Sequence, residues 1–298
     1  MSELLAFNND IMELIVKNID KESHLIVGLT CKGLYKILKT TNDNKKLSGT
    51  LRYLTSNLNL LKYGHKNGCP WDKRTIKNIL ENKESFECLK YLHENGCPWS
   101  QWTCHYAAEN GNIECLKYAH ENGCPWSIHI CNRAARSGHL ECLKYLHENG
   151  CPWNEWTCRN AAENGNIECL KYAHNNGCPW SEWTCSSAAQ NGQLECLKYL
   201  RGNGCPWSNT ACSYAAENGY LECLKYLHEN GCPWSVYDTC DHAAENGHLE
   251  CLKYLHENGC PWSVYTCSYA AKNGHLECLK YCRDNGCHWV DTDAGEAV

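Results

Sequence analysis

Apolar and polar residues follow one another along this chain in a pattern that returns about every 27 residues. Within residues 100–126, SQWTCHYAAENGNIECLKYAHENGCPW, the segment 102–110 carries two adjacent alanines, which favour a helix of little bulk. In the segment 113–122, Leu116 and Ala119 follow the first isoleucine at near-helical spacing and form one apolar face. A glycine directly after each segment suits the residue that ends a helix. The pattern therefore predicts a unit of helix, tight turn, helix and loop.

Each predicted unit closes on the tripeptide Cys-Pro-Trp. Its cysteines are Cys69, Cys97, Cys124, Cys151, Cys178, Cys205, Cys232 and Cys260, and the variant Cys287-His288-Trp289 ends the series. Self-similarity at such a period indicates a solenoid, in which each unit buries its apolar face against its neighbours. We expect an all-α repeat array over residues 45–289, with about eight full units and a degenerate first one. A small helical module over 1–44 precedes it, and a disordered tail over 290–298 follows.

Charge and hydropathy exclude several classes of function. The net charge is −6 and the isoelectric point about 6.2, so no basic footprint for nucleic acid is present. The sequence contains no run of 18 apolar residues, the length that could span a membrane. Its first ten residues lack the pattern of a secretory signal. We expect a monomeric protein of the cytoplasm, with the nucleus left open.

Cysteine is unusually frequent, with 26 residues, and 24 of them occupy three fixed positions of the unit. Besides the Cys-Pro-Trp position, one position lies in each predicted helix, as Cys104 and Cys115 show; Cys31 and Cys282 lie outside all three. Equivalent helices pack about 8–10 Å apart, too far for disulfides between equivalent cysteines, which need Cα atoms within about 7 Å. No C-x2-C pair occurs, and cysteine packs as a small hydrophobe. We therefore expect no metal and no cofactor, with a metal-buffering protein as an alternative.

Repetition also argues against catalysis. A Cys-His pair recurs in nearly every unit, so no single nucleophile stands out, and no glycine-rich phosphate loop follows a strand. The histidines favour two positions of the unit. Those of the turn (His139, His248 and His275) are expected to form turn hydrogen bonds. Those of the other position lie near the end of the second helix, where a ring that can carry a positive charge interacts favourably with the negative end of the helix dipole. They are His93, His120, His147, His174, His228 and His256.

The unit resembles the ankyrin repeat. Residues 102–108, WTCHYAA, are similar to the family's T-P-L-H-x-A-A start, and residues 138–146, GHLECLKYL, to its turn and second helix. The unit is about six residues shorter than the family's 33, and the missing residues fall where the family has its β-hairpin finger. The resemblance thus implies an ankyrin-like helical solenoid with short loops in place of fingers. Each Trp of Cys-Pro-Trp would cover the edge between neighbouring units.

The N-terminal residues resemble an F-box, the motif that docks substrate receptors onto a Skp-type adaptor of a cullin-based ubiquitin ligase. The apolar spacing of residues 4–38 and the stretch Thr30-Cys31-Lys32 carry this resemblance, whereas Asn8 and Leu34 depart from the motif. It implies adaptor contacts by Phe7, Ile11, Ile15, Ile19 and Leu25. The alternative is a helical cap that only shields the first repeat. The combination of an F-box-like N-terminus with near-identical repeats resembles ankyrin/F-box proteins of large DNA viruses of amoebae.

A few positions of the first helix vary while the framework stays nearly fixed. In the ankyrin family this helix faces the partner, and Trp, Tyr and Arg are enriched at binding hot spots. The predicted partner-binding residues are Trp102, His105, Tyr106, His129, Arg133, Trp156, Arg159, Asn160, Trp183, Tyr214, Tyr237, His242, Tyr265 and Tyr269. The resemblances together imply a protein-binding array that delivers its partner to a ubiquitin ligase. A plain scaffold without a ligase link is the alternative, and neutral drift is the alternative explanation of the variable positions.

Overall fold

Residues 58–66, 71, 73–81, 85–235 and 238–287 are described by the structure, a computed structural model. They belong to two compact units, one within residues 1–127 and the other within 128–298. Every regular element in these ranges is an α-helix, and they contain no strand, which confirms the expected all-α solenoid without β-hairpin fingers. The predicted N-terminal module, with its five adaptor residues, and the predicted tail lie outside the described residues.

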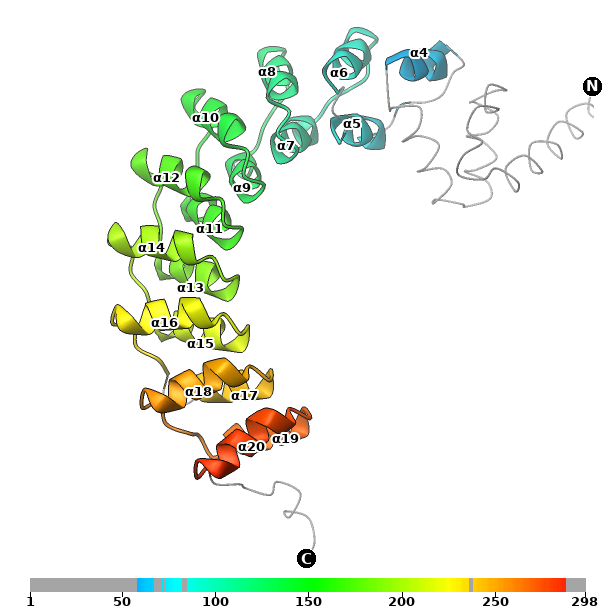
Figure 1. The fold of residues 1–298 in the computed structure, drawn as a ribbon. Helices are drawn as coiled ribbons and strands as arrows, with labels where there is room; N and C mark the ends of the chain where they lie inside the picture. The colour runs from blue at the N-terminus through cyan, green and yellow to red at the C-terminus, as the bar shows by residue number, and fades with distance from the viewer. Residues whose placement is uncertain (1–57, 67–70, 72, 82–84, 236–237, 288–298) are drawn as a thin grey trace, which may run out of the picture. The chain divides into compact units, whose positions relative to one another are not determined.

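The helices follow one another as pairs, each pair being one repeat (Figure 1). In the first unit they are α4 (Leu58–Lys66), α5 (Lys73–Leu80), α6 (Ser85–Glu94), α7 (Gln101–Glu109) and α8 (Ile113–Glu121). In the second unit the first four pairs are α9 (Ile130–Arg136) with α10 (Leu140–Glu148), α11 (Glu155–Glu163) with α12 (Ile167–Asn175), α13 (Glu182–Gln190) with α14 (Leu194–Gly202), and α15 (Asn209–Glu217) with α16 (Leu221–Glu229). The last two pairs are α17 (Thr239–Glu245) with α18 (Leu249–Glu257), and α19 (Thr266–Lys272) with α20 (Leu276–Asp284).

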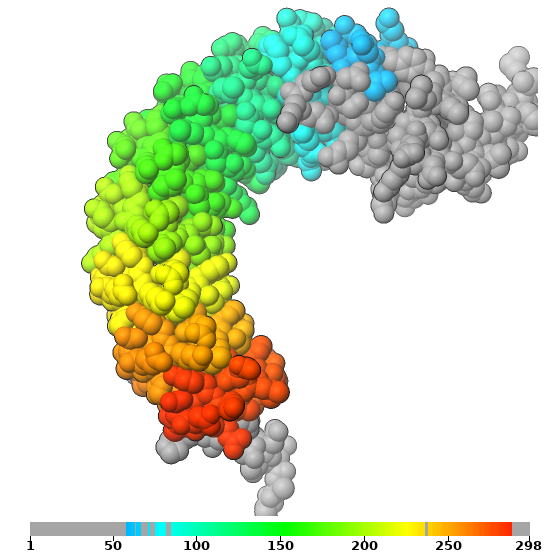
Figure 2. All heavy atoms as spheres, viewed as in Figure 1, coloured from blue at the N-terminus to red at the C-terminus, as the bar shows by residue number. Residues whose placement is uncertain are grey.

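Small side chains bring the first helices of successive pairs close together. In α11, Cys158, Ala161 and Ala162 are fully buried, and the same three positions are buried in α7, α13 and α15. Within the second unit the odd-numbered helices therefore contact one another more closely than the even-numbered helices do. They line the inner side of that unit's curve (Figure 1). Viewed as spheres, its successive pairs are stacked in direct contact (Figure 2).

From α7 onward, a glycine follows both helices of each described repeat. After α11, Gly165 has a φ of 72°, and the next amide, of Asn166, donates to the carbonyl of Ala161 at 2.9 Å. After α12, Gly177 has a φ of 81°, and the amide of Cys178 donates to the carbonyl of Ala173 at 2.9 Å. Both are Schellman-type ends, which need a left-handed residue. The second one buries the cysteine of Cys-Pro-Trp and turns the chain toward the next repeat.

The first helices differ in length, and their first-turn residue explains two of the differences. Helices α9 and α19 have seven residues, whereas α7, α11, α13 and α15 have nine. Ile128 and Val264 stand where the longer helices have Gln, Glu or Asn. Branching at Cβ restricts the side chain and lowers helix propensity. The two short helices accordingly begin about two residues later.

Tryptophan, histidine and tyrosine join neighbouring repeats. The Trp180 ring stacks on His174 of its own repeat at 3.7 Å, and lies edge-on to Tyr199 of the next repeat at 6.4 Å between ring centroids. His174 Nδ1 and the Tyr199 hydroxyl share a hydrogen bond of 3.0 Å. The same Trp–His stacking recurs at His93–Trp99, His120–Trp126, His147–Trp153, His228–Trp234 and His256–Trp262. These contacts confirm that the indoles cover the edge between repeats.

The same contacts give the second-helix histidines a packing role beside the one expected at the helix end. Burial lowers the pKa of His174, which favours the neutral ring over a cation at the helix end. Stacking on Trp180 and the hydrogen bond with Tyr199 hold the His174 ring between the two repeats. Two turn histidines also pack between repeats: the rings of His248 and His275 lie against Gly219 and Gly247 of the preceding repeat.

Candidate interaction surface

Large aromatic side chains remain exposed at the start of several first helices. Trp156 of α11 and Trp183 of α13 are each 46 % exposed, and Tyr265, directly before α19, is 50 % exposed. His129 is exposed at the equivalent place before α9. In the first unit, Trp102 of α7 is 48 % exposed. Because the other apolar positions of the first helices are buried, these rings form a recurrent exposed feature of the fold.

A second set of predicted residues lies one helical turn further on and is half-buried. Its members are Tyr106, Arg133, Asn160, Tyr214, His242 and Tyr269. Where both positions are aromatic the rings are neighbours, with 6.2 Å between the centroids of Trp102 and Tyr106 and 6.0 Å for Tyr265 and Tyr269. These residues extend the exposed rings along the helix. Tyr237 lies outside the described residues.

The remaining predicted column faces neighbouring repeats instead of solvent. His105 is only 5 % exposed, and its Nε2 shares a hydrogen bond of 2.8 Å with the Ser127 hydroxyl, so we exclude it from the surface. Ser186 and Ser213, at the equivalent position, are buried as well. These three members of the column are therefore buried and contribute nothing to the exposed surface.

Arg159 belongs to the same column but reaches the surface. Its Nε donates to the Ser187 hydroxyl of the next repeat at 2.8 Å. Its guanidinium lies 4.6 Å from the ring centroid of Trp156, within the range of a cation–π contact. The two contacts hold the Trp156 ring and a positive charge together at the start of α11.

The insertion at Asp238 joins two repeats through hydroxyl groups. Ser213 donates to Asp238 Oδ1 at 3.0 Å. Asp241 is the third residue of α17, and its carboxylate is buried. It accepts hydrogen bonds from the hydroxyls of Ser263 and Thr266 in the next repeat. This polar network was not predicted from the sequence, although Thr recurs at the first buried position of these helices, as at Thr239 and Thr266.

The second helices present a different surface, made of charged pairs. Lys171 lies 2.9 Å from Glu168 on α12, and Lys198 lies 2.7 Å from Glu195 on α14. All four side chains are largely exposed, and such pairs contribute little to stability. They serve below as control positions.

All 24 described cysteines are free thiols and buried, which agrees with their expected role in packing. Within a repeat, the thiols of the first helix and of Cys-Pro-Trp are neighbours. The Cys178 thiol, together with burial, raises the pKa of Cys158, while the hydrogen bond between them lowers the pKa of Cys178. The last repeat adds a third thiol, because the Sγ atoms of Cys267, Cys282 and Cys287 all lie within 4.8 Å of one another.

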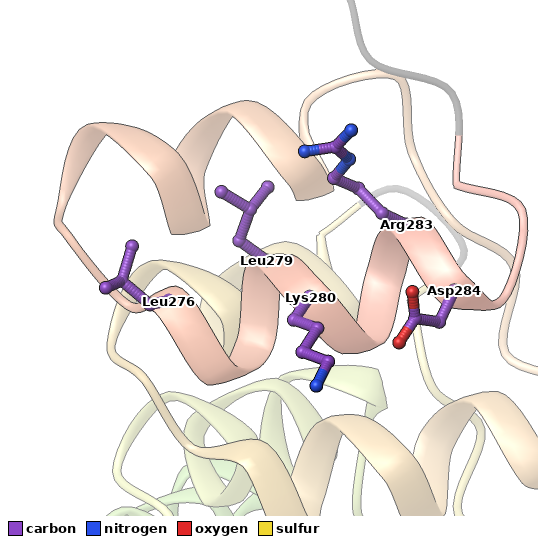
Figure 3. A pocket seen from close by; sticks show the side chains of 5 residues that line it. All are labelled: Leu276, Leu279, Lys280, Arg283 and Asp284. Atoms are coloured by element: carbon purple, nitrogen blue, oxygen red, sulfur yellow. The ribbon is translucent and has the colours of Figure 1, made fainter.

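An open hollow of about 400 Å³ lies on α20 and is lined by Leu276, Leu279, Lys280, Arg283 and Asp284 (Figure 3). Leu276 is 73 % exposed, whereas the equivalent Leu249 is half-buried under the following repeat. The hollow is therefore the uncovered stacking face of the last described repeat. In none of the described ranges is a helix long and apolar enough to cross a membrane.

Paired helices, buried alanines and glycine-ended turns define a helical-repeat protein. Models of the ankyrin repeat match residues 131–174, 158–238 and 185–266. Residues 131–266 therefore match the ankyrin repeat, and the pairs α7 with α8 and α19 with α20 share its adjacent alanines and the glycines after both helices. Ankyrin repeats are typically protein-interaction modules and usually non-catalytic. The crystal structure of the human ASB11 ankyrin repeat domain is similar with a TM-score of 0.48 at 20 % identity, over 60 % of this chain and 96 % of that one. No curated protein matches the sequence.

Proposed function

We propose that this chain binds another protein through the starts of its first helices. We call this region the aromatic surface: His129, Trp156, Trp183 and Tyr265, with Arg159 beside Trp156. The observation that carries the proposal is the near-half exposure of Trp156 and Trp183 at the same place on adjacent helices. Single exposed apolar residues need no explanation, but a recurrent aromatic row indicates an interaction site.

The chemistry of this surface favours a protein partner. Tryptophan, tyrosine and arginine dominate the energetics of protein interfaces, because large rigid rings bury much area at little cost in side-chain entropy. Adjacent helices of the array lie about 10 Å apart, so one partner segment can reach several rings. The hydrogen bond from Arg159 to Ser187 fixes the guanidinium before binding, which lowers the entropic cost of association. The net charge of −6 disfavours a nucleic acid.

The proposal is tested by quantitative affinity capture from eukaryotic lysate with the full chain as bait. We compare the natural sequence with the double variant Trp156→Ala/Trp183→Ala and with Lys171→Ala/Lys198→Ala on the second helices. The expected result is a specific protein whose recovery falls at least tenfold with the tryptophan variant and stays unchanged with the lysine variant. Equal recovery by both variants would refute the aromatic surface as the binding site.

A finer proposal is that the N-terminal residues link this partner to a cullin-based ubiquitin ligase in the cytoplasm. Its support is the F-box resemblance of residues 4–38, with Ile11 and Ile15 at apolar positions of the motif. The test compares the full chain with the variant Ile11→Glu/Ile15→Glu, which leaves the repeats unaltered. Recovery of a Skp-type adaptor and a cullin by the natural chain alone would support the link. Failure of the natural chain to recover the adaptor would leave a plain ankyrin scaffold.

A further inference from the structure

The last repeat departs from the others at one buried position of its second helix. Cys282 stands where the preceding repeats have either leucine, as at Leu255, or alanine, as at Ala173, and like them it is fully buried. A leucine at this position packs as an ordinary core residue. Alanine fills the same position at Ala119 and Ala173, so what sets the last described repeat apart is the thiol itself rather than the size of the side chain.

The fold places this additional thiol beside the pair of thiols that each described repeat from α7 onward already has. Cys267 comes from α19 and Cys282 from α20, and Cys287 follows the glycine that ends α20. The amide of Cys287 donates to the carbonyl of Cys282 at 2.9 Å, which folds the chain back over the helix end. Cys267 Sγ lies 3.8 Å from the carbonyl oxygen of Cys287. As a result the three Sγ atoms converge from three separate segments, the one such group among the described residues.

This geometry is close to that of a metal–thiolate centre. Zn–S bonds are about 2.3 Å, so sulfurs around a tetrahedral zinc lie about 3.8 Å apart. The three Sγ atoms lie within 4.8 Å of one another, so a contraction of about 1 Å at most would bring them to that spacing. Thiolate sulfur is a soft ligand that selects zinc and monovalent copper over hard cations.

The surroundings suit a site that holds net negative charge. All three cysteines are buried, which keeps competing water away. The positive charge of Arg283, one residue after Cys282, acts on Cys267. Three thiolates on a divalent ion leave a net charge of −1, which the guanidinium partly offsets.

We propose that Cys267, Cys282 and Cys287 bind one thiophilic metal ion of the zinc class and thereby fasten the last repeat. Binding replaces three S–H bonds by three metal–sulfur bonds, and the three protons pass to solvent. The ion joins α19, α20 and the segment after α20. These belong to the last described repeat, which no further described repeat covers. It is a structural site, because ligands from three segments stabilise the folded arrangement over the unfolded chain.

The test measures zinc bound per chain in reduced full-length protein, by elemental analysis after gel filtration in the presence of a weak chelator. The variant Cys282→Leu introduces the residue that the three preceding repeats have at this position and keeps all other thiols. The reverse variant Leu255→Cys adds the third thiol to the pair Cys240 and Cys260 in the preceding repeat. We expect one zinc fewer in Cys282→Leu and one more in Leu255→Cys, with unchanged helix content by circular dichroism.

Two results would overturn the proposal. The first is equal zinc content in the natural chain and in folded Cys282→Leu. The second, decisive if Cys282→Leu fails to fold, is equal content in the natural chain, Cys282→Ser and Leu255→Cys. A charge-transfer band with Co²⁺ that is present in the natural chain and absent in Cys282→Ser would assign the ligands directly.

Discussion

Replacing Gly192 by alanine should destabilise the second unit by about 3 kcal/mol. Two costs add up. Gly192 has a φ of 70°, and a left-handed conformation costs a residue with a Cβ about 1–2 kcal/mol. In addition, the new Cβ would lie 2.5 Å from the Tyr220 ring of the next repeat, and overpacking of this kind costs about 1–3 kcal/mol. Because Tyr220 is 40 % exposed and can shift, we take the lower part of that range.

Gly177 is the matched control for this prediction. Its φ is 81°, but an added Cβ would have no neighbour within 4 Å. Gly177→Ala should therefore cost only the backbone strain, about 1.5 kcal/mol. The double variant Gly192→Ala/Tyr220→Ala lacks the clashing ring. It should therefore be less stable than the single variant Tyr220→Ala by only about the amount that Gly177→Ala loses relative to the natural chain.

Urea unfolding followed by circular dichroism measures these differences, with the slope of each curve checked so that free energies are compared between similar transitions. Long repeat arrays can unfold in more than one step, so the comparison rests on the transition that the Gly192 and Gly177 variants share. Equal destabilisation by Gly192→Ala and Gly177→Ala would refute the reasoning. The turn of one repeat would then not be packed against the next repeat's side chain.

Two further predictions concern the aromatic contacts between repeats. Trp180→Ala should lower the free energy of unfolding by about 2 kcal/mol, because it removes the stack on His174 and the edge contact with Tyr199. Trp183→Ala, at the exposed surface, should change it by less than about 0.5 kcal/mol. Equal losses of stability in thermal unfolding would contradict the assignment of the two rings. Since burial lowers the pKa of His174 below its ordinary 6.5, folding favours the neutral ring. Its contribution to stability is thus complete above about pH 6.5 and is lost as the pH falls below that value. His174→Gln should flatten this part of the profile in urea titrations, and an unchanged pH dependence would contradict the shift.

The repeat and its helices could be predicted because the same local signals recur in every unit. Adjacent alanines, a glycine after each helix and the Cys-Pro-Trp end all act within a few residues, so the sequence shows them directly. The expected helix over 102–110 is found at Gln101–Glu109, and the one over 113–122 at Ile113–Glu121. The role of the indoles followed from the shortened unit, which left an edge for them to cover.

Contacts between side chains of different repeats were harder to predict. Equal spacing made the column of His105 look like a surface column, but its side chain turns toward the neighbouring repeat and is buried. The hydrogen bond between His174 and Tyr199 joins residues 25 positions apart, and no local pattern reveals it. The thiol group of the last repeat was missed for the same reason, since Cys282 attracts notice in the sequence only as an exception to the columns.

The most direct test of the aromatic surface replaces single residues of the full chain by a photoactivatable amino acid and identifies the proteins that become crosslinked in lysate. Position 183 lies on a first helix within the surface, and position 198 lies exposed on the second helix of the same repeat. The account predicts that position 183 crosslinks efficiently to the partner recovered by affinity capture and that position 198 does not. Crosslinking of that partner from position 198 but not from 183 would show that it binds the opposite side of the array.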